Sequence, residues 1–371
     1  MVKLKALTKD DKYVPELVEL FNCVFGGMTA ELWAWKHLQN PLLEAASTIA
    51  AMINGKIIGA ISFMPAEYIV QGKRCKVLQS CDAMVHPEYR GRGISTKIRT
   101  AAEEYYKDLG YQFMIAFPNE QSLPGALKVG WLHLFNLDSF VLFQNSYPLL
   151  KNFAPRFLAK IGSFPLDRYH LITKKILGRT ATQRKGLRIR TYEKCPPAII
   201  TINKKKATSL NRMHLSFEYL NWRLDRKPGA KYSYIVVEDD VQPIAYAIVN
   251  LPISPGDKGI ARIIDLDTIS GDIQALDFLI AATVKYLAGR CNLVHLPLYN
   301  GRAAHGKIFR NHGFISLKIL PSKSKSYPFI AWLLDEDHFS TGTCNDTGEL
   351  PCDVFRKKSN WKISLLDTDL A

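Results

Sequence analysis

Apolar and polar positions along the first 145 residues alternate with two periods, one typical of strands and one typical of helices. A period of two, or a short apolar run, predicts a strand, whereas apolar residues three and four positions apart predict one face of a helix. Strands are expected at residues 3–7, 48–53, 56–64, 76–85, 113–117 and 134–144, and helices at residues 14–25, 29–39, 94–109 and 123–129. The alternation predicts an α/β unit over residues 1–145.

The strand that ends at Val85 is joined to the helix that begins at Ile94 by a loop with two glycines and two arginines, Arg90-Gly91-Arg92-Gly93. Glycine has no Cβ, so the backbone at these positions can approach a ligand closely and adopt a positive φ. The first amides of the following helix have no intrahelical acceptor, and the helix dipole favours an anion there. The arginines can add charge-assisted hydrogen bonds. The loop therefore predicts a phosphate-binding site.

The run Arg90-Gly91-Arg92-Gly93-Ile94-Ser95 resembles motif A of the GNAT superfamily of N-acetyltransferases. In that motif, Gln or Arg is followed by two residues, Gly, one residue, and Gly or Ala. Ser95 replaces the last Gly or Ala and is also small. The resemblance implies that the amides of the loop bind the pyrophosphate of acetyl-CoA. It also implies that Met84 and Val85, at the end of the preceding strand, offer backbone groups to the pantetheine arm and the thioester oxygen.

The segment after the strand at residues 113–117 resembles motif B of the same superfamily, in which an asparagine follows the strand and a helix ends in glycine plus an aromatic residue. Asn119 fits a polar contact to pantetheine, and Gly130-Trp131 fits the end of the helix. Many members carry a tyrosine as general acid four residues before that glycine, whereas this chain has Ala126. The acid is then Ser122, a tyrosine elsewhere, or water.

Transfer of an acetyl group to an amine needs one group that accepts the proton of the amine and another that protonates the leaving thiolate. Asp82 is the candidate base, because it lies three residues before Val85 on the strand that the resemblance places beside the cofactor. Some members carry an acidic residue on this strand for that role. The alternative is a carboxylate in an ion pair with Arg or Lys at the sheet edge. Ser122 is the candidate acid.

The second half of the chain repeats the first weakly. The segment Trp35–Pro41 is echoed by Trp222–Pro228, and Ile57–Ile61 falls on Ile244–Ile248 at the same offset. These matches predict a duplicated chain. Two unrelated α/β domains are the alternative.

The copy lacks the phosphate loop, because residues 264–272 contain no paired glycines and no arginine. Their carboxylates would repel a pyrophosphate. We therefore expect a catalytic domain at residues 1–145 and a degenerate copy at residues 187–335 that does not bind CoA. A connector at residues 146–186 and a C-terminal extension at residues 336–371 complete the expected organisation.

The positive charge of the chain is concentrated in one segment. The 371 residues carry a formal net charge of +15, and residues 147–206 hold fifteen Lys or Arg against Asp167 and Glu193. One interpretation is a solvated basic connector, and the other is a docking surface for an anionic acceptor or a membrane surface. Nucleic acid is the least supported partner, because no nucleic-acid-binding motif accompanies the charge.

Cysteine and hydropathy patterns bear on the compartment. The seven cysteines are scattered without a Cys-x-x-Cys, and the nine histidines lack ligand spacing, so neither a disulfide framework nor a metal site is expected. No signal peptide and no apolar run of spanning length is recognised. We expect a cytoplasmic protein.

Together these features predict an α/β (α+β) fold of the GNAT type, with a mixed, mainly antiparallel sheet flanked by helices and duplicated along the chain. The expected activity is N-acyl transfer from acetyl-CoA to an amine on a small molecule, an amino sugar or a cell-envelope precursor. A Fem-type aminoacyl transferase, which also pairs two such domains, is one alternative. A non-catalytic acyl-CoA-binding or regulatory protein is another. The sequence leaves open whether the protein is a monomer or a dimer.

Overall fold

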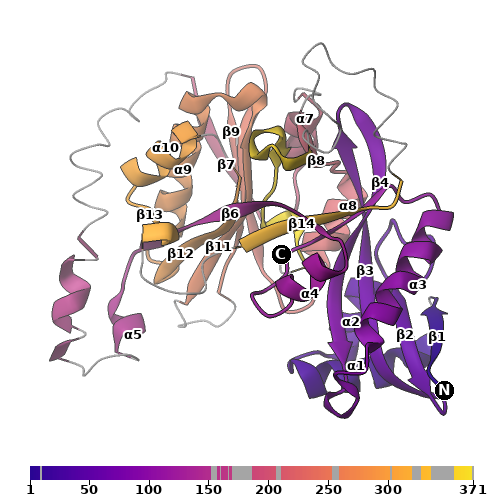
Figure 1. Ribbon diagram of the computed structural model, residues 1–371. Helices are drawn as coiled ribbons and strands as arrows, with labels where there is room; N and C mark the ends of the chain where they lie inside the picture. The colour runs from indigo at the N-terminus through magenta and orange to yellow at the C-terminus, as the bar shows by residue number, and fades with distance from the viewer. Residues whose placement is uncertain are drawn as a thin grey trace. The chain divides into compact units, whose positions relative to one another are not determined.

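The structure, a computed structural model, consists of two compact units that are each assembled from three separate segments (Figure 1). Unit 1 comprises Met1–Asn136, Ser209–Pro228 and Pro328–Asn360, and unit 2 comprises Leu137–Thr208, Gly229–Tyr327 and Trp361–Ala371. The structure describes residues 1–8, 11–151, 157–158, 160–165, 167–168, 186–205, 210–252, 259–300, 303–319, 327–335 and 355–369.

The sheet of unit 1 is mainly antiparallel, as the sequence predicts. Its main strands, in spatial order, are β1 (Lys3–Leu7), β2 (Thr48–Ile53), β3 (Lys56–Val70), β4 (Lys73–Val85), β5 (Phe113–Ala116) and β14 (Tyr327–Leu333). The short β8 (Asn211–Met213) pairs with β3 beside this path. Among the pairings whose register the structure describes in this sheet, β4 with β5 is the parallel one, over Val77–Gln79 and Phe113–Ile115. Strands β3 and β4 are longer than the expected strands at residues 56–64 and 76–85, because Gln71 and Gly72, both at positive φ, close them into one long hairpin.

Helices pack against this sheet through two clusters of buried apolar residues. The described helices of unit 1 include α1 (Val14–Val24), α2 (Ala30–His37), α3 (Ile94–Asp108), α4 (Leu123–Lys128) and the short α8 (Phe217–Leu220). One cluster joins α1 and α2 to the sheet through Leu17, Leu20 and Trp33. The other joins α3 to it through Ile94 and Ile98. The apolar residues at helical spacing in the sequence are therefore the ones that pack on the sheet.

Unit 2 has a sheet with the same sequence of pairings. Its strands, in spatial order, are β6 (Leu132–Phe143), β12 (Leu293–Tyr299), β11 (Ile260–Thr268), β10 (Pro243–Asn250), β9 (Tyr232–Glu238) and β7 (Arg188–Tyr192). Among the described pairings of this sheet, β11 with β12 is again the parallel one, over Ile260–Arg262 and Leu293–His295. The helices of unit 2 include α5 (Tyr147–Leu150), α7 (Pro197–Lys204), α9 (Ile273–Leu287) and α10 (Ala303–Asn311), and α9 packs on the sheet through Leu276, Leu279 and Ile280.

The two sheets carry the same irregularity at the same place. In unit 1 the register moves from Ala60 opposite Met84 to Ser62 opposite Cys81, so β4 holds one extra residue. In unit 2 it moves from Ala247 opposite Leu266 to Val249 opposite Ile263, so β11 holds one extra residue as well. The offset from β3 to β10 is the one that separates Trp35 from Trp222. A shared β-bulge is a positional feature of a fold, so the duplication extends to backbone detail.

Each half of the chain contributes a late strand to a sheet built mainly from the other half. Strand β6, from the first half, pairs antiparallel with β12 in unit 2. Strand β14, from the second half, pairs antiparallel with β5 in unit 1. The compact units therefore do not coincide with continuous stretches of sequence. The limits expected from the sequence, residues 1–145 and 187–335, describe the repeated segments of sequence and stay a prediction.

Much of the basic connector expected at residues 146–186 lies outside the described residues, as do residues 336–354 of the C-terminal extension. Within the part of the chain that the structure describes, no helix combines the length and the apolar character needed to cross a bilayer.

Candidate functional site

The loop between β4 and α3 has the backbone of an anion-binding turn. Gly91 and Gly93 have φ values of 75° and 70°, and a Cβ added at either would meet no atom within 4 Å. Gly93 is the N-cap of α3 and provides no side-chain cap, and the first turn of α3 contains no acidic residue. The positive end of α3, with its first amides at Ile94 and Ser95, is thus left to an external acceptor.

Close packing fixes where this helix begins. A Cβ on Gly59 of β3 would lie 3.1 Å from Cγ2 of Ile94 and 3.2 Å from the carbonyl oxygen of Met84. Glycine at this position lets the first turn of α3 sit directly against the strand that pairs with the end of β4. The helix N-terminus and the end of β4 are therefore held side by side.

The two arginines of the loop are oriented by nearby carbonyl oxygens. Nε of Arg90 donates to the carbonyl oxygen of Val85 at 3.2 Å, and Nη2 of Arg92 donates to that of Glu88 at 3.1 Å. The guanidinium of Arg92 also lies 5.3 Å from the centre of the Tyr89 ring. Both arginines are exposed. Two cations consequently flank the N-terminus of α3, where an anionic ligand would meet them.

Strand β4 extends beyond its pairing with β5 and bends as it does so. The parallel pairing ends at Gln79, whereas β4 continues to Val85. The bulge falls at Asp82 and Ala83, and Asp82 adopts a φ of 48°. Residues in this left-handed conformation are strained unless they are glycine, and Asp is among the few that tolerate it. The bulge therefore turns the Asp82 side chain away from the direction that a regular strand would give it, close to the end of β4.

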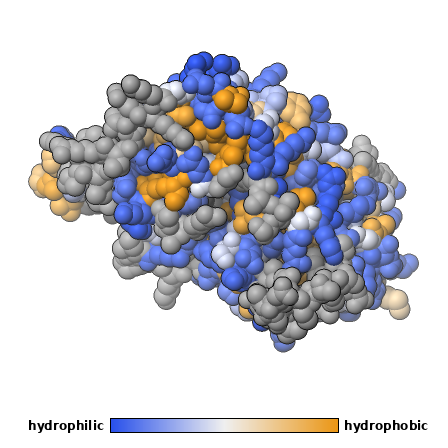
Figure 2. Space-filling model, turned by 90° about the horizontal axis from the view of Figure 1, so that it is seen from above, coloured by the Kyte–Doolittle hydropathy of each residue, from blue (hydrophilic) through white to orange (hydrophobic). Residues whose placement is uncertain are grey.

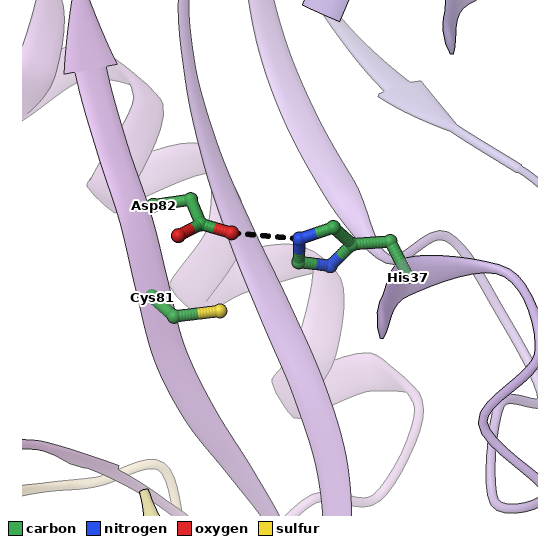
Figure 3. Close-up of side chains that lie close together, drawn as sticks. All are labelled: His37, Cys81 and Asp82. Carbon is green, nitrogen blue, oxygen red and sulfur yellow. Dashed lines mark hydrogen bonds and ion pairs between the residues drawn. The ribbon is translucent and has the colours of Figure 1, made fainter. Parts of the chain in front are cut away.

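The Asp82 side chain is buried and contacts two residues of α2, Lys36 and His37. Figure 3 shows the contact with His37. Nζ of Lys36 lies 2.8 Å from each carboxylate oxygen, and Nε2 of His37 lies 2.7 Å from Oδ2. Burial alone would raise the pKa of Asp82, but the charge of Lys36 and the contact with His37 outweigh it and hold this pKa well below its usual range. The arrangement is the ion pair that sequence reasoning weighed as the alternative to a base.

Cys81 completes a group that superficially matches a metal site. One potential ligand atom each from His37, Cys81 and Asp82 lies within 4.8 Å of the others (Figure 3). However, the ammonium of Lys36 already contacts both oxygens of Asp82 and would repel a divalent cation. The donor set therefore does not fit a metal, and the group acts as an ion-paired cluster.

The motif B segment forms a compact turn before α4. Oδ1 of Asn119 accepts hydrogen bonds from the backbone amides of Gln121 and Ser122 at 3.1 and 2.9 Å, and from Oγ of Ser122 at 2.9 Å. Asn119 and Ser122 are exposed, whereas Ala126 is buried in the apolar cluster under α3. The structure thus brings the two predicted residues of this segment together, and it places the position without a tyrosine inside the core.

In unit 2, the helix N-terminus that corresponds to that of α3 is capped by a side chain of the protein itself. Helix α9 begins at Asp272, whose carboxylate accepts from the amides of Gln274 and Ala275 at 2.8 and 3.1 Å. A negative side chain thus occupies the position that Gly93 leaves open at α3. The expectation that the copy lacks a phosphate loop agrees with this cap.

The C-terminal segment occupies the strand ends of the same unit. Nζ of Lys362 lies 2.8 Å from carboxylate oxygens of both Asp265 and Asp267. Burial alone would lower the pKa of Lys362, but the charge of Asp265 outweighs it and raises this pKa. The helical turn η8 (Leu365–Asp367) contacts β11 and β12, the strands that correspond to β4 and β5.

Sequence reasoning did not identify Lys36 and His37. They lie more than forty positions before Asp82, and only the packing of α2 against the sheet brings them to it. The repeated Trp35–Pro41 segment contains both residues and was the one signal that could have directed attention to them.

Comparisons with known proteins agree with the geometry. Residues 4–133 match the family described as "Acetyltransferase (GNAT) domain". No protein of curated function shows significant sequence similarity to the chain.

Solved structures match the fold over almost the whole chain. A probable N-acyltransferase from Enterococcus faecalis matches with a TM-score of 0.63 and 12% identity, over 92% of this chain and 75% of that one. A GNAT protein from Anabaena variabilis matches with a TM-score of 0.57 and 14% identity, over 90% and 73%. A tandem GNAT protein from the clavulanic acid biosynthesis pathway matches with a TM-score of 0.52 and 13% identity, over 90% and 99%.

Proposed function

We propose that the chain, whose residues 4–133 match the GNAT acetyltransferase domain family, transfers an acetyl group from acetyl-CoA to an amine acceptor by direct attack. In this reaction the amine nitrogen forms a bond to the thioester carbonyl carbon, the C–S bond breaks, the amine loses a proton and the CoA thiolate gains one. The observation that carries the proposal is the N-terminus of α3, which has glycine at its cap, no acidic residue in its first turn and two arginines beside it.

The cofactor roles follow from the positions of the loop residues. The amides of Gly91, Gly93, Ile94 and Ser95 would hold the pyrophosphate, and Arg90 and Arg92 would add charge to it. The backbone of Met84 and Val85 lies on the stretch of β4 beyond its pairing with β5, where the pantetheine arm would run. Asn119 uses Oδ1 within its own turn, so its Nδ2 is the group proposed to contact pantetheine.

The proton of the amine is proposed to pass to Asp82 and His37 acting as a pair. A carboxylate with a depressed pKa is by itself a weak proton acceptor. The carboxylate nevertheless holds the His37 ring in place at 2.7 Å. Ser122 is the proposed donor to the thiolate, and its hydroxyl is already held by Asn119.

The acceptor class is proposed from chemistry alone. An amine on a small molecule, an amino sugar or an envelope precursor would satisfy the reaction, and an anionic acceptor would suit the positive net charge of the chain.

One observation favours a second function, a non-catalytic acyl-CoA-binding protein. Position 126 is an alanine where the motif B resemblance implies a tyrosine, and its buried methyl group has no proton to donate to the thiolate.

A ligand titration with matched glycine variants tests the cofactor site. Gly93 and Gly110 lie at opposite ends of α3 with φ values of 70° and 75°, and neither has an atom within 4 Å of an added Cβ. Gly93→Glu and Gly110→Glu therefore introduce the same strain and the same charge. Acetyl-CoA should stabilise the wild type and Gly110→Glu by mass action, and should fail to stabilise Gly93→Glu.

Turnover separates an enzyme from a binding protein. CoA release that depends on both acetyl-CoA and one member of an amine panel would establish catalysis. Stabilisation by acetyl-CoA without release of CoA from any amine would favour the binding function. Stabilisation by aminoacyl-tRNA in place of acetyl-CoA would favour the Fem-type reaction.

A further inference from the structure

A helix in unit 2 exposes a row of large apolar side chains. Residues 157–158 and 160–165 are helical, and Phe157, Leu158, Ile161 and Phe164 are 71%, 56%, 56% and 62% exposed. Phe157, Ile161 and Phe164 are spaced by four and three residues, so they lie on one face. We propose that this face docks on an anionic lipid surface, with the apolar side chains inserted between headgroups.

The helix turns its polar side to the protein and its apolar side to solvent. Ser163 is buried and donates its hydroxyl to the carbonyl oxygen of Lys160 at 2.9 Å, and its own carbonyl oxygen accepts from Oγ of the buried Ser146 at 3.3 Å. On the same side, a Cβ on Gly162 would lie 3.7 Å from Leu150. An ordinary surface helix has the reverse orientation. Figure 2 shows orange apolar atoms on the surface at this end of unit 2, at the left of the view.

Cations accompany the apolar face. Lys160 and Arg168 are exposed, and Arg168 lies 4.9 Å from the centre of the Phe164 ring. Asp167 is the only acidic residue in the sequence from 147 to 186, and its Oδ1 accepts from the amide of Ser146 at 2.6 Å. Apolar insertion combined with Lys and Arg near the headgroups is the physical basis of interfacial binding.

The sign of the charge distinguishes a lipid surface from a second copy of the chain. A two-fold dimer would place this patch against itself and bring Lys160 and Arg168 of both copies together. An anionic bilayer complements the same cations while it buries the same aromatic rings. Phosphatidylserine-rich membranes supply that charge, whereas phosphatidylcholine membranes do not.

Co-sedimentation with vesicles tests the proposal without unfolding the protein, because every substituted side chain is exposed. The purified full chain should bind vesicles of phosphatidylcholine and phosphatidylserine more tightly than vesicles of phosphatidylcholine alone. Phe157→Ser combined with Phe164→Ser should weaken binding at least tenfold. Phe217→Ser removes a phenylalanine that is 51% exposed elsewhere and should leave binding unchanged.

Charge reversal and salt supply the electrostatic test. Lys160→Glu and Arg168→Glu should each weaken binding to anionic vesicles about fivefold, and the effect should shrink at high salt. Lys285→Glu, on α9, is the matched control. Equal binding to neutral and anionic vesicles, or no binding to either, would overturn the proposal. Concentration-dependent dimerisation that Phe157→Ser with Phe164→Ser abolishes would also overturn it, in favour of a second copy as the occupant. Acetyl-CoA binding is measured separately, so its failure would not be confused with this result.

Discussion

Trp35 and Trp222 donate their indole N–H groups to each other's backbone carbonyl oxygens, at 2.7 and 2.8 Å, and their rings stack with centres 5.5 Å apart. Both side chains are buried. Their positions correspond in the two repeats, so the contact is one that two identical subunits would make across a two-fold axis. The duplicated segments thus meet at the residues that first revealed the duplication in the sequence.

Replacing either tryptophan should lower the free energy of unfolding by more than the loss of buried apolar surface alone would. Trp35→Phe or Trp222→Phe leaves a buried carbonyl oxygen without its donor, which costs about 1–3 kcal/mol. Because the two hydrogen bonds belong to one stacked pair, the double variant should lose less stability than the sum of the single variants. Urea unfolding of all four proteins measures this coupling. Strict additivity would show that the two hydrogen bonds act independently.

Removing the charge of Asp82 should destabilise unit 1 at neutral pH. Asp82→Asn leaves the buried ammonium of Lys36 without its counter-ion, which costs about 3–5 kcal/mol. Lys36→Met in the same chain should recover much of that loss, because the uncompensated charge disappears. Calorimetric unfolding of the single and double variants checks the prediction. A double variant as unstable as Asp82→Asn would contradict the ion-pair explanation.

The same carboxylate predicts an acid-dependent loss of stability. The folded-state pKa of Asp82 is depressed, so its contribution is complete above the ordinary Asp pKa of about 3.9. The contribution falls as pH drops below that value toward the folded pKa. The stability difference between the wild type and Asp82→Asn should therefore be constant from pH 5 to pH 8 and shrink in stronger acid. A difference that already shrinks near pH 6 would point to another group.

His295 predicts a second pH effect, in unit 2. Burial, aided by the charge of Arg262, lowers the pKa of this histidine from 6.5 to about 4. The unfolded chain binds the proton more readily, so stability should decrease as pH falls below about 6.5 and toward 4. The loss at pH 5 should be about 1–2 kcal/mol. His295→Gln removes the titrating group, and denaturant unfolding at pH 7 and pH 5 should show a smaller pH dependence for that variant.

One acetyl-CoA should bind per chain. The anion position of unit 2 holds the carboxylate of Asp272, and Lys362 occupies the ends of its strands. Calorimetric titration should give a stoichiometry near one. Asp272→Ala, which costs about 1 kcal/mol as a lost cap, should not create a second site while Lys362 stays in place. A stoichiometry of two for the wild type would refute this assignment.

The sequence identified features that depend on local geometry and missed those that depend on packing. Pro87, Gly93 and Gly110 mark the end of a strand and the two ends of a helix, so the phosphate loop was predictable from neighbours in the chain. The contact of Asp82 with Lys36 and His37 was not, because nothing local distinguishes an ion-paired carboxylate from an unpaired one. The GNAT fold followed from motif A, and the structural matches confirm it.

The exchange of strands β6 and β14 between the two sheets was equally hidden from the sequence. Strand β14 reads as an ordinary apolar run, and its local sequence favours a strand without specifying a partner. The residues that accept it, on β5, lie some two hundred positions earlier. Pairing between such distant segments is decided by the completed fold.

That exchange also sets the order of events during synthesis. The edge of β5 leaves the ribosome early, yet the strand that covers it ends at Leu333, more than 200 residues later. At about 5–20 residues per second, this edge waits about 10–40 s for its partner. An unpaired edge is a template for pairing with other chains. Nascent copies of this protein are therefore expected to depend on chaperones more than copies of a protein in which each sheet is completed by adjacent sequence.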